Sequence, residues 1–163
     1  MEPTPGQPSH RDRLAETGPA VDDHGRVVTA NRQAAAFYRQ AQRAADAPQA
    51  MTALRLALNA DPNFGMAIAD LGALTGTADR LPDRQQMSWE RHHIEVVRSA
   101  ATGNGARAAG LLREHLASVG CDPLAFHIVA QLGRDHDFED LTCRLPGCHL
   151  SRWPPSADPE LHQ

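Results

Sequence analysis

Residues 34–62 read AAAFYRQAQRAADAPQAMTALRLALNADP, and no other stretch of the chain has so regular a pattern of apolar side chains. Its first half has apolar or small residues at the i, i+3, i+4, i+7 spacing of one helix face, at Ala34, Phe37, Tyr38 and Ala41. Its second half repeats this pattern at Ala50, Leu54, Ala57 and Leu58. Asp61-Pro62 ends the pattern, because the residue before a proline is pushed out of the α region. The stretch therefore predicts a hairpin of two amphipathic helices with facing apolar stripes.

The same 3.6-residue pattern predicts four more helices, at about 64–75, 84–102, 105–118 and 123–134. The chain is therefore expected to be all-α, a short α-α solenoid of about six helices in antiparallel pairs over residues 30–134. Residues 1–29 are rich in proline and polar residues, which predicts a flexible N-terminal arm in which only Val27-Val28 could dock. Residues 135–163 form a tail that contains proline and cysteine and has no sustained periodicity.

The hairpin resembles the tetratricopeptide repeat, a helix-turn-helix unit of 34 residues. Its second helix and closing proline match the small, large, small and proline positions of that repeat, at Ala50, Leu54, Ala57 and Pro62. The pair Leu71-Gly72, 34 residues after Phe37-Tyr38, fits the large-then-small pair of the first helix. An ordinary helical bundle is the alternative, because periodicity alone does not separate the two architectures.

Over residues 23–133 the chain resembles bacterial members of the tetratricopeptide-repeat protein 38 family. The resemblance lies in the hairpin closed by Asp-Pro and in a helix with the pattern Glu90, His93, Ile94 and Val97. The chain departs from the family at GTADRLPD, residues 76–83, where members have a further helix, and members continue for several hundred residues. The resemblance implies a helical-repeat scaffold and no catalytic residue.

Composition excludes several classes of function. A net charge of −4 gives no general attraction to nucleic acid or to anionic membranes. All 16 basic residues are arginine, so lysine Schiff-base chemistry is excluded. No stretch has the ~18–20 apolar residues of a membrane span, and the N-terminus lacks the apolar core of a secretion signal. An odd number of cysteines, three, in a chain without a recognisable secretion signal predicts a reducing cytoplasmic location.

Two clusters are candidate binding sites. Arg32, Arg39 and Arg43 share one side of the first helix, which lines the concave groove in repeats of this type. These arginines form either an ordinary solvated face or a binding site for an acidic peptide or a C-terminal carboxylate. The second cluster lies in the tail and offers two thiolates and two imidazoles, a donor set that suits zinc, at His136, Cys143, Cys148 and His149. An incidental tail and a disulfide between the two tail cysteines are the alternatives.

Glu90 and His93 form half of a carboxylate-bridged di-iron motif, which needs a second Glu-x-x-His that this chain lacks. His93 is therefore expected to face the core and to bond to a carboxylate or a carbonyl, whereas the neighbouring His92 is expected to be solvated.

The sequence thus predicts a non-enzymatic helical-repeat scaffold or adaptor, without a cofactor, that binds a protein or peptide partner. The alternative is a metal- or thiol-dependent protein that uses the Cys/His cluster of the tail. The last helix has apolar residues on nearly all sides, among them Phe126 and Ile128, which predicts that the tail, a partner or a second copy in a homodimer covers this helix.

Overall fold

The computed structural model describes residues 18–77, 81, 84–133, 138 and 153–154. Within this part of the chain there are six α-helices and no β-strand, so the all-α prediction is confirmed. The helices are α2 (Arg32–Gln42), α3 (Ala47–Ala60), α4 (Gly65–Thr75), α5 (Ser88–Ala101), α6 (Gly105–Val119) and α7 (Pro123–Leu132).

Most helices begin at a polar side chain that accepts a backbone N–H, as expected for N-cap residues. Asn31 accepts from Ala34 at the start of α2, at 2.8 Å. Asp46 and Asp122 begin α3 and α7 in the same way, and each of these helices has a proline in its first turn. α5 differs, because it begins four residues later than the sequence predicts and its first turn is held by the carboxylate of Glu90, which accepts from the Met87 N–H at 2.7 Å.

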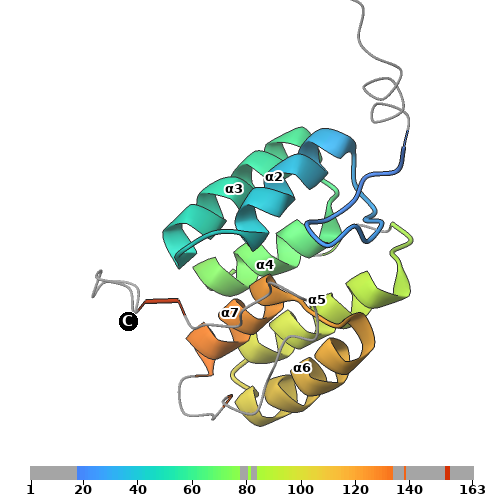
Figure 1. Cartoon of the computed structure of the whole chain (residues 1–163). Helices are drawn as coiled ribbons and strands as arrows, with labels where there is room; N and C mark the ends of the chain where they lie inside the picture. Colours follow the sequence, from blue (N-terminus) through green and yellow to red (C-terminus); the bar gives the residue numbers. More distant parts are fainter. Residues whose placement is uncertain (1–17, 78–80, 82–83, 134–137, 139–152, 155–163) are drawn as a thin grey trace, which may run out of the picture.

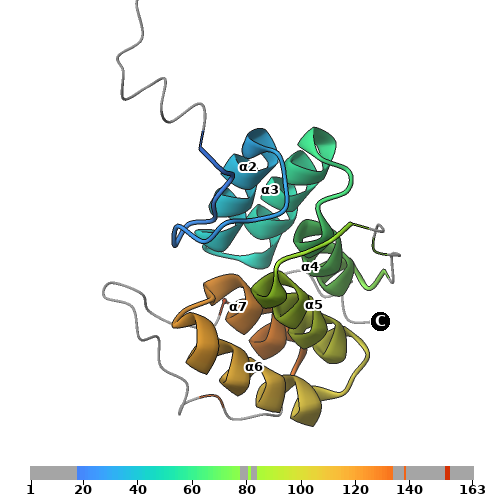
Figure 2. The ribbon, with the colours of Figure 1, turned by 90° about the vertical axis from the view of Figure 1, so that its right-hand side faces the viewer.

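The helices form two groups that share one interface (Figures 1 and 2). α2, α3 and α4 form the first group, in which α2 packs on α3 and α3 on α4. α5, α6 and α7 form the second group, and α4 packs directly on α5 to join the two. α7 also reaches back to α4 and α2, so it lies at the centre of the molecule rather than at one end of a linear stack.

Two apolar clusters fill this arrangement. The first lies among α2, α3 and α4 and extends to α5 and α7, and the second lies among α5, α6 and α7. Large apolar side chains such as Leu54, Val97, Leu112 and Val129 are fully buried in these clusters. Phe37, Leu58 and Leu71 pack against the first cluster and are partly buried.

Residues 18–29 belong to the fold, which corrects the prediction of a flexible arm that extends to residue 29. Ala20 and Val28 are buried in the first apolar cluster, and Val21 pairs with Val27 in an isolated antiparallel bridge. Asp22 closes the turn between them by accepting the backbone N–H groups of His24 and Arg26, at 3.0 and 2.8 Å. The sequence of this segment has no helical pattern, so it did not predict a folded element. The contacts that hold the segment are to helices far along the chain.

Two tail residues are also part of the core. Phe138 packs edge-on against Phe126, with ring centroids 6.2 Å apart. Trp153 stacks on His127 at 4.7 Å, and its indole N–H donates to the carbonyl oxygen of Ala44 at 3.1 Å. Phe138 and Trp153 therefore both pack against α7.

Candidate functional site

Five polar side chains from five different helices meet in the interior of the protein. They lie at the interface between the two helix groups, and the structure places them completely or almost completely out of solvent. The five are Tyr38 of α2, Asp70 of α4, His93 of α5, His115 of α6 and Asp122 at the start of α7. We call this set the buried His–Asp network.

His93 is the centre of the network. Its Nε2 lies 2.7 Å from Asp70 Oδ1, and its Nδ1 lies 2.6 Å from Asp122 Oδ2. A carboxylate only accepts hydrogen bonds, so both ring nitrogens of His93 donate and the ring is an imidazolium. His93 therefore faces the core and bonds to carboxylates, as the sequence predicted.

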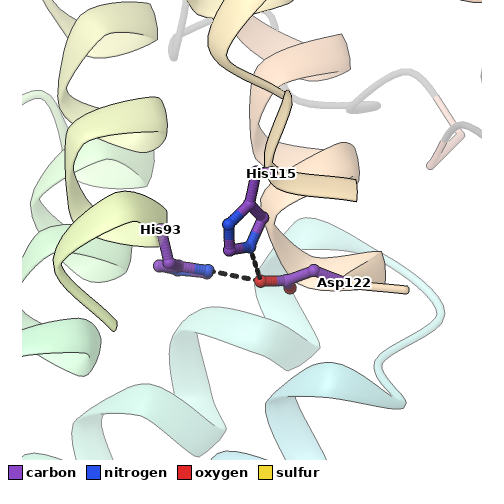
Figure 3. A group of neighbouring side chains, drawn as sticks. All are labelled: His93, His115 and Asp122. Carbon is purple, nitrogen blue, oxygen red and sulfur yellow. Dashed lines mark hydrogen bonds and ion pairs between the residues drawn. The ribbon is translucent and has the colours of Figure 1, made fainter. Parts of the chain in front are cut away.

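Asp122 joins three groups at once (Figure 3). Its Oδ2 accepts from His93 Nδ1 and, at 2.8 Å, from His115 Nε2. Its Oδ1 accepts the backbone N–H of Ala125 at 3.1 Å, which is the N-cap bond of α7. One side chain thus fixes the start of α7 and links this helix to α5 and α6.

Asp70 extends the network into the first helix group. It accepts the Tyr38 O–H at 2.8 Å in addition to the His93 N–H. Burial and the negative charges of Asp70 and Asp122 raise the pKa of Tyr38 well above its usual value, so Tyr38 stays a neutral donor. The path from Tyr38 through Asp70 and His93 to Asp122 is an unbroken hydrogen-bonded connection between the two groups of helices.

The pKa values of the network follow from burial and charge together. Burial would lower the pKa of His93, but the charges of Asp70 and Asp122 and their hydrogen bonds raise it to about 10. Burial would raise the pKa of Asp122, but the charge of His93 and the hydrogen bonds from both histidines hold it well below its usual value. Burial lowers the pKa of His115, and the hydrogen bond to Asp122 offsets this only in part. His115 is therefore neutral beside a charged His93.

Glu90, the partner of His93 in the Glu-x-x-His pattern, has a separate role. Its two carboxylate oxygens accept the backbone N–H and the side-chain O–H of Thr29, each at 2.7 Å. Glu90 thus attaches the segment before α2 to the start of α5, which is a structural use of a buried carboxylate.

The arginines that we predicted as a peptide-binding row lie on one side of α2, and they contact residues of their own chain. Arg32 donates to the Gly18 carbonyl oxygen, and Arg39 donates to the Val21 carbonyl oxygen at 2.8 Å. Arg43 forms an ion pair with Asp23, in which its Nε lies 2.7 Å from Oδ1. The arginine row therefore binds residues 18–23 of the same chain, an extended segment that ends at the acidic Asp23.

The four residues predicted to hold zinc, His136, Cys143, Cys148 and His149, lie outside the described residues. The third cysteine, Cys121, stands directly before Asp122 and is disulfide-bonded. This differs from the reduced thiols that we expected, because cysteine spacing alone does not show which thiols the fold brings together.

A cavity of about 350 Å³ lies between α4 and the C-terminal half of α5. Small and apolar residues form most of its wall, namely Ile68, Ala69, Gly72 and Ala73 of α4, together with Leu81 and Ala101. Arg98, Thr77 and Thr102 are its polar members. Ala101 and Thr102 are exposed, so this cavity opens to the surface, in contrast to the buried His–Asp network.

Comparisons with protein-family models, with curated proteins and with solved structures find no match to this chain. Among the described helices, none is both long and apolar enough to cross a membrane.

Sequence reasoning found His93 and missed its partners. Asp70 is the single charged residue in the otherwise apolar helix GMAIADLGALT, which is the one signal that could have marked it as a buried polar group. His115 and Asp122 gave no such signal, because Asp122 reads as an ordinary helix cap and His115 stands among polar neighbours.

Proposed function

We propose that the chain is a non-enzymatic helical-repeat adaptor that holds an amphipathic helix of a partner protein in the cavity between α4 and α5. The contrast between the two sites carries this proposal. His93, His115 and Asp122 have side chains 0–1% exposed, so no substrate reaches the groups that could do acid–base chemistry. The cavity is open and mostly apolar, and its volume is at the lower end of the range for ligand sites.

The chemistry of the cavity wall supports a helix as the occupant. Alanine and glycine residues on α4 allow a neighbouring backbone to come close. The same kind of contact joins α2 to α3, where four alanines are fully buried, namely Ala34, Ala41, Ala50 and Ala57. An amphipathic helix binds such a surface by laying its apolar face into it. The sequence pointed to the arginine row of α2 instead, but those arginines hold residues 18–23.

A matched pair of substitutions tests the proposal. Ala101→Trp places a large side chain at the mouth of the cavity, whereas Ala117→Trp makes the same change at an exposed position of α6 away from it. Proteins captured by the purified wild-type chain are identified by mass spectrometry, and the apolar helix of each is made as a labelled peptide. We expect the peptide to bind to wild type and to Ala117→Trp with similar affinity, and to Ala101→Trp at least tenfold more weakly.

Equal affinity for both variants would contradict the proposal. Absence of any peptide binding would do so as well, and would leave a segment of this same chain, outside the described residues, as the occupant of the cavity.

Three sequence-based hypotheses stay predictions. Metal or thiol chemistry at the tail cysteines is the alternative function. A homodimer through α7 is less attractive, because Phe126 and Ile128 are buried within the chain. A cytoplasmic location is tested by the oxidation state of Cys121 in cells, because disulfides rarely persist in a reducing cytosol.

A further inference from the structure

We propose that His93, His115 and Asp122 form a binding site for a divalent transition-metal ion, and that zinc is the ion whose ligand preference they match. This inference is independent of the cavity between α4 and α5. It rests on the donor set and on the groups behind the donors.

The three donors suit zinc in type and in position. Two imidazole nitrogens and a carboxylate oxygen form a His2Asp set, and one donor atom from each residue lies within 4.8 Å of the other two. In a tetrahedral zinc site with bonds of about 2.0–2.2 Å, donor atoms lie roughly 3.3 Å apart. The separations of 2.6 and 2.8 Å from Asp122 Oδ2 to the two imidazole nitrogens are hydrogen bonds, and each lengthens by roughly half an ångström when an ion takes the place of the two protons.

The groups behind the donors are those that metal-binding histidines need. A histidine that binds a metal through one nitrogen commonly donates its other N–H to a carboxylate, which fixes the orientation of the ring. His93 has this arrangement already, because its Nδ1 faces Asp122 while its Nε2 donates to Asp70, which is held in turn by Tyr38. Asp122 presents Oδ2 to both histidines while the N–H of Ala125 holds Oδ1.

Charge balance also favours an ion. Without metal, two carboxylates face one imidazolium and one neutral imidazole, which leaves one net negative charge in the interior. Zinc would displace the Nδ1 proton of His93 and move the proton of His115 from Nε2 to Nδ1, so that a dication and two neutral imidazoles would balance Asp70 and Asp122. The buried charge would then be zero, and burial of an uncompensated charge is costly.

One atom shows that the metal-free network is not fully satisfied. His115 Nδ1 is buried and has no hydrogen-bond partner among the described residues, and it lies on the side of α5 in Figure 3. Nδ1 is not a zinc ligand, because zinc would bind Nε2 and leave the His115 proton on Nδ1, so the partner that this atom needs is a water molecule rather than the ion. The half-buried His92 packs edge-on against His115, with ring centroids 5.1 Å apart.

The sample for the test is the full-length protein, stripped with a chelator, incubated with zinc and then dialysed to remove unbound metal. Zinc content is measured by plasma mass spectrometry, and affinity is measured by competition with a chromophoric chelator. We expect one zinc ion per chain and a rise in melting temperature of about 5–10 °C at a zinc concentration of about 100 Kd, because the ion binds the folded state.

His115→Gln removes a ligand but keeps an N–H donor for Asp122, and we expect it to weaken zinc binding at least a hundredfold. His127→Gln makes the same change at another buried histidine, outside the network, and we expect it to leave zinc affinity unchanged. If His115→Gln does not fold, Asp70→Asn keeps all three ligands and changes only the group behind His93, and we expect a 10–100-fold loss.

Two results would overturn the proposal. The first is wild-type protein that retains less than about a tenth of an equivalent of zinc and melts at the same temperature with and without it. The second is zinc binding that survives in His115→Gln and Asp70→Asn at wild-type affinity, which would place the ion elsewhere in the chain.

Discussion

Replacing Asp122 with alanine should be among the most damaging single changes to this protein. The substitution removes the acceptor of His93 and His115 and the N-cap of α7. Loss of one partner of a buried ion pair costs about 3–5 kcal/mol, and loss of an N-cap costs about 1 kcal/mol. We therefore expect a loss of about 4–6 kcal/mol in the free energy of unfolding, against the 5–15 kcal/mol that typical domains have in total.

Asp46→Ala is the matched control. Asp46 also begins a helix with a proline in its first turn, and it also accepts one backbone N–H, from Gln49 at 2.8 Å, but it forms no hydrogen bond with a histidine of the described part of the chain. This control should cost only about 1 kcal/mol. Urea unfolding of the metal-free proteins, followed by circular dichroism at the helix band, measures both values. A difference of less than about 1 kcal/mol between the two variants would refute the idea that the histidine contacts hold the helix groups together.

Three further predictions use other parts of the structure. Trp153→Ala should lower the free energy of unfolding by about 3–5 kcal/mol, because the indole is buried, and unchanged thermal stability would show that Trp153 does not pack against α7. Gly72→Ala should destabilise the fold by about 1–3 kcal/mol, because a Cβ there would lie 2.8 Å from the carbonyl oxygen of Thr77, whereas Gly110→Ala, at an open helix position, should stabilise it by up to about 1 kcal/mol. Calorimetry that shows equal effects of the two substitutions would contradict this. The metal-free protein should lose up to about 5 kcal/mol of its free energy of unfolding as pH rises from about 6.5 to about 10, because the raised pKa of His93 in the folded state favours folding only while the ring is protonated. A free energy of unfolding that stays constant with pH in urea titrations would count against the charged ring.

The helices could be predicted from the sequence because their determinants are local. Apolar residues at helical spacing, together with Asp, Asn, Gly and Pro at the ends, define the observed boundaries to within about three residues at most ends. The start of α5 is the exception, because its cap is the Glu90 carboxylate, and that side chain is also bound by the distant Thr29.

The network could be predicted only in part, because its bonds join residues far apart in the chain. His93 lies 23 residues from Asp70 and 29 from Asp122, and no local pattern connects them. The position of His93 on an apolar stripe was enough to predict that it faces the core and bonds to a carboxylate or a carbonyl. The identity of the carboxylates depends on how α4, α5 and α7 pack, and so does the docking of residues 18–29.

The protonation state of His93 tests the central claim most directly, namely that a charged histidine between two carboxylates joins the two helix groups. Nitrogen-15 NMR of histidine-labelled, metal-free protein at pH 8 distinguishes a ring with two N–H groups from a neutral ring with one. The structure predicts that both nitrogens of His93 are protonated at this pH, as expected for a pKa of about 10. A His93 that is neutral at pH 8, and that titrates near the ordinary value of about 6.5, would contradict the claim.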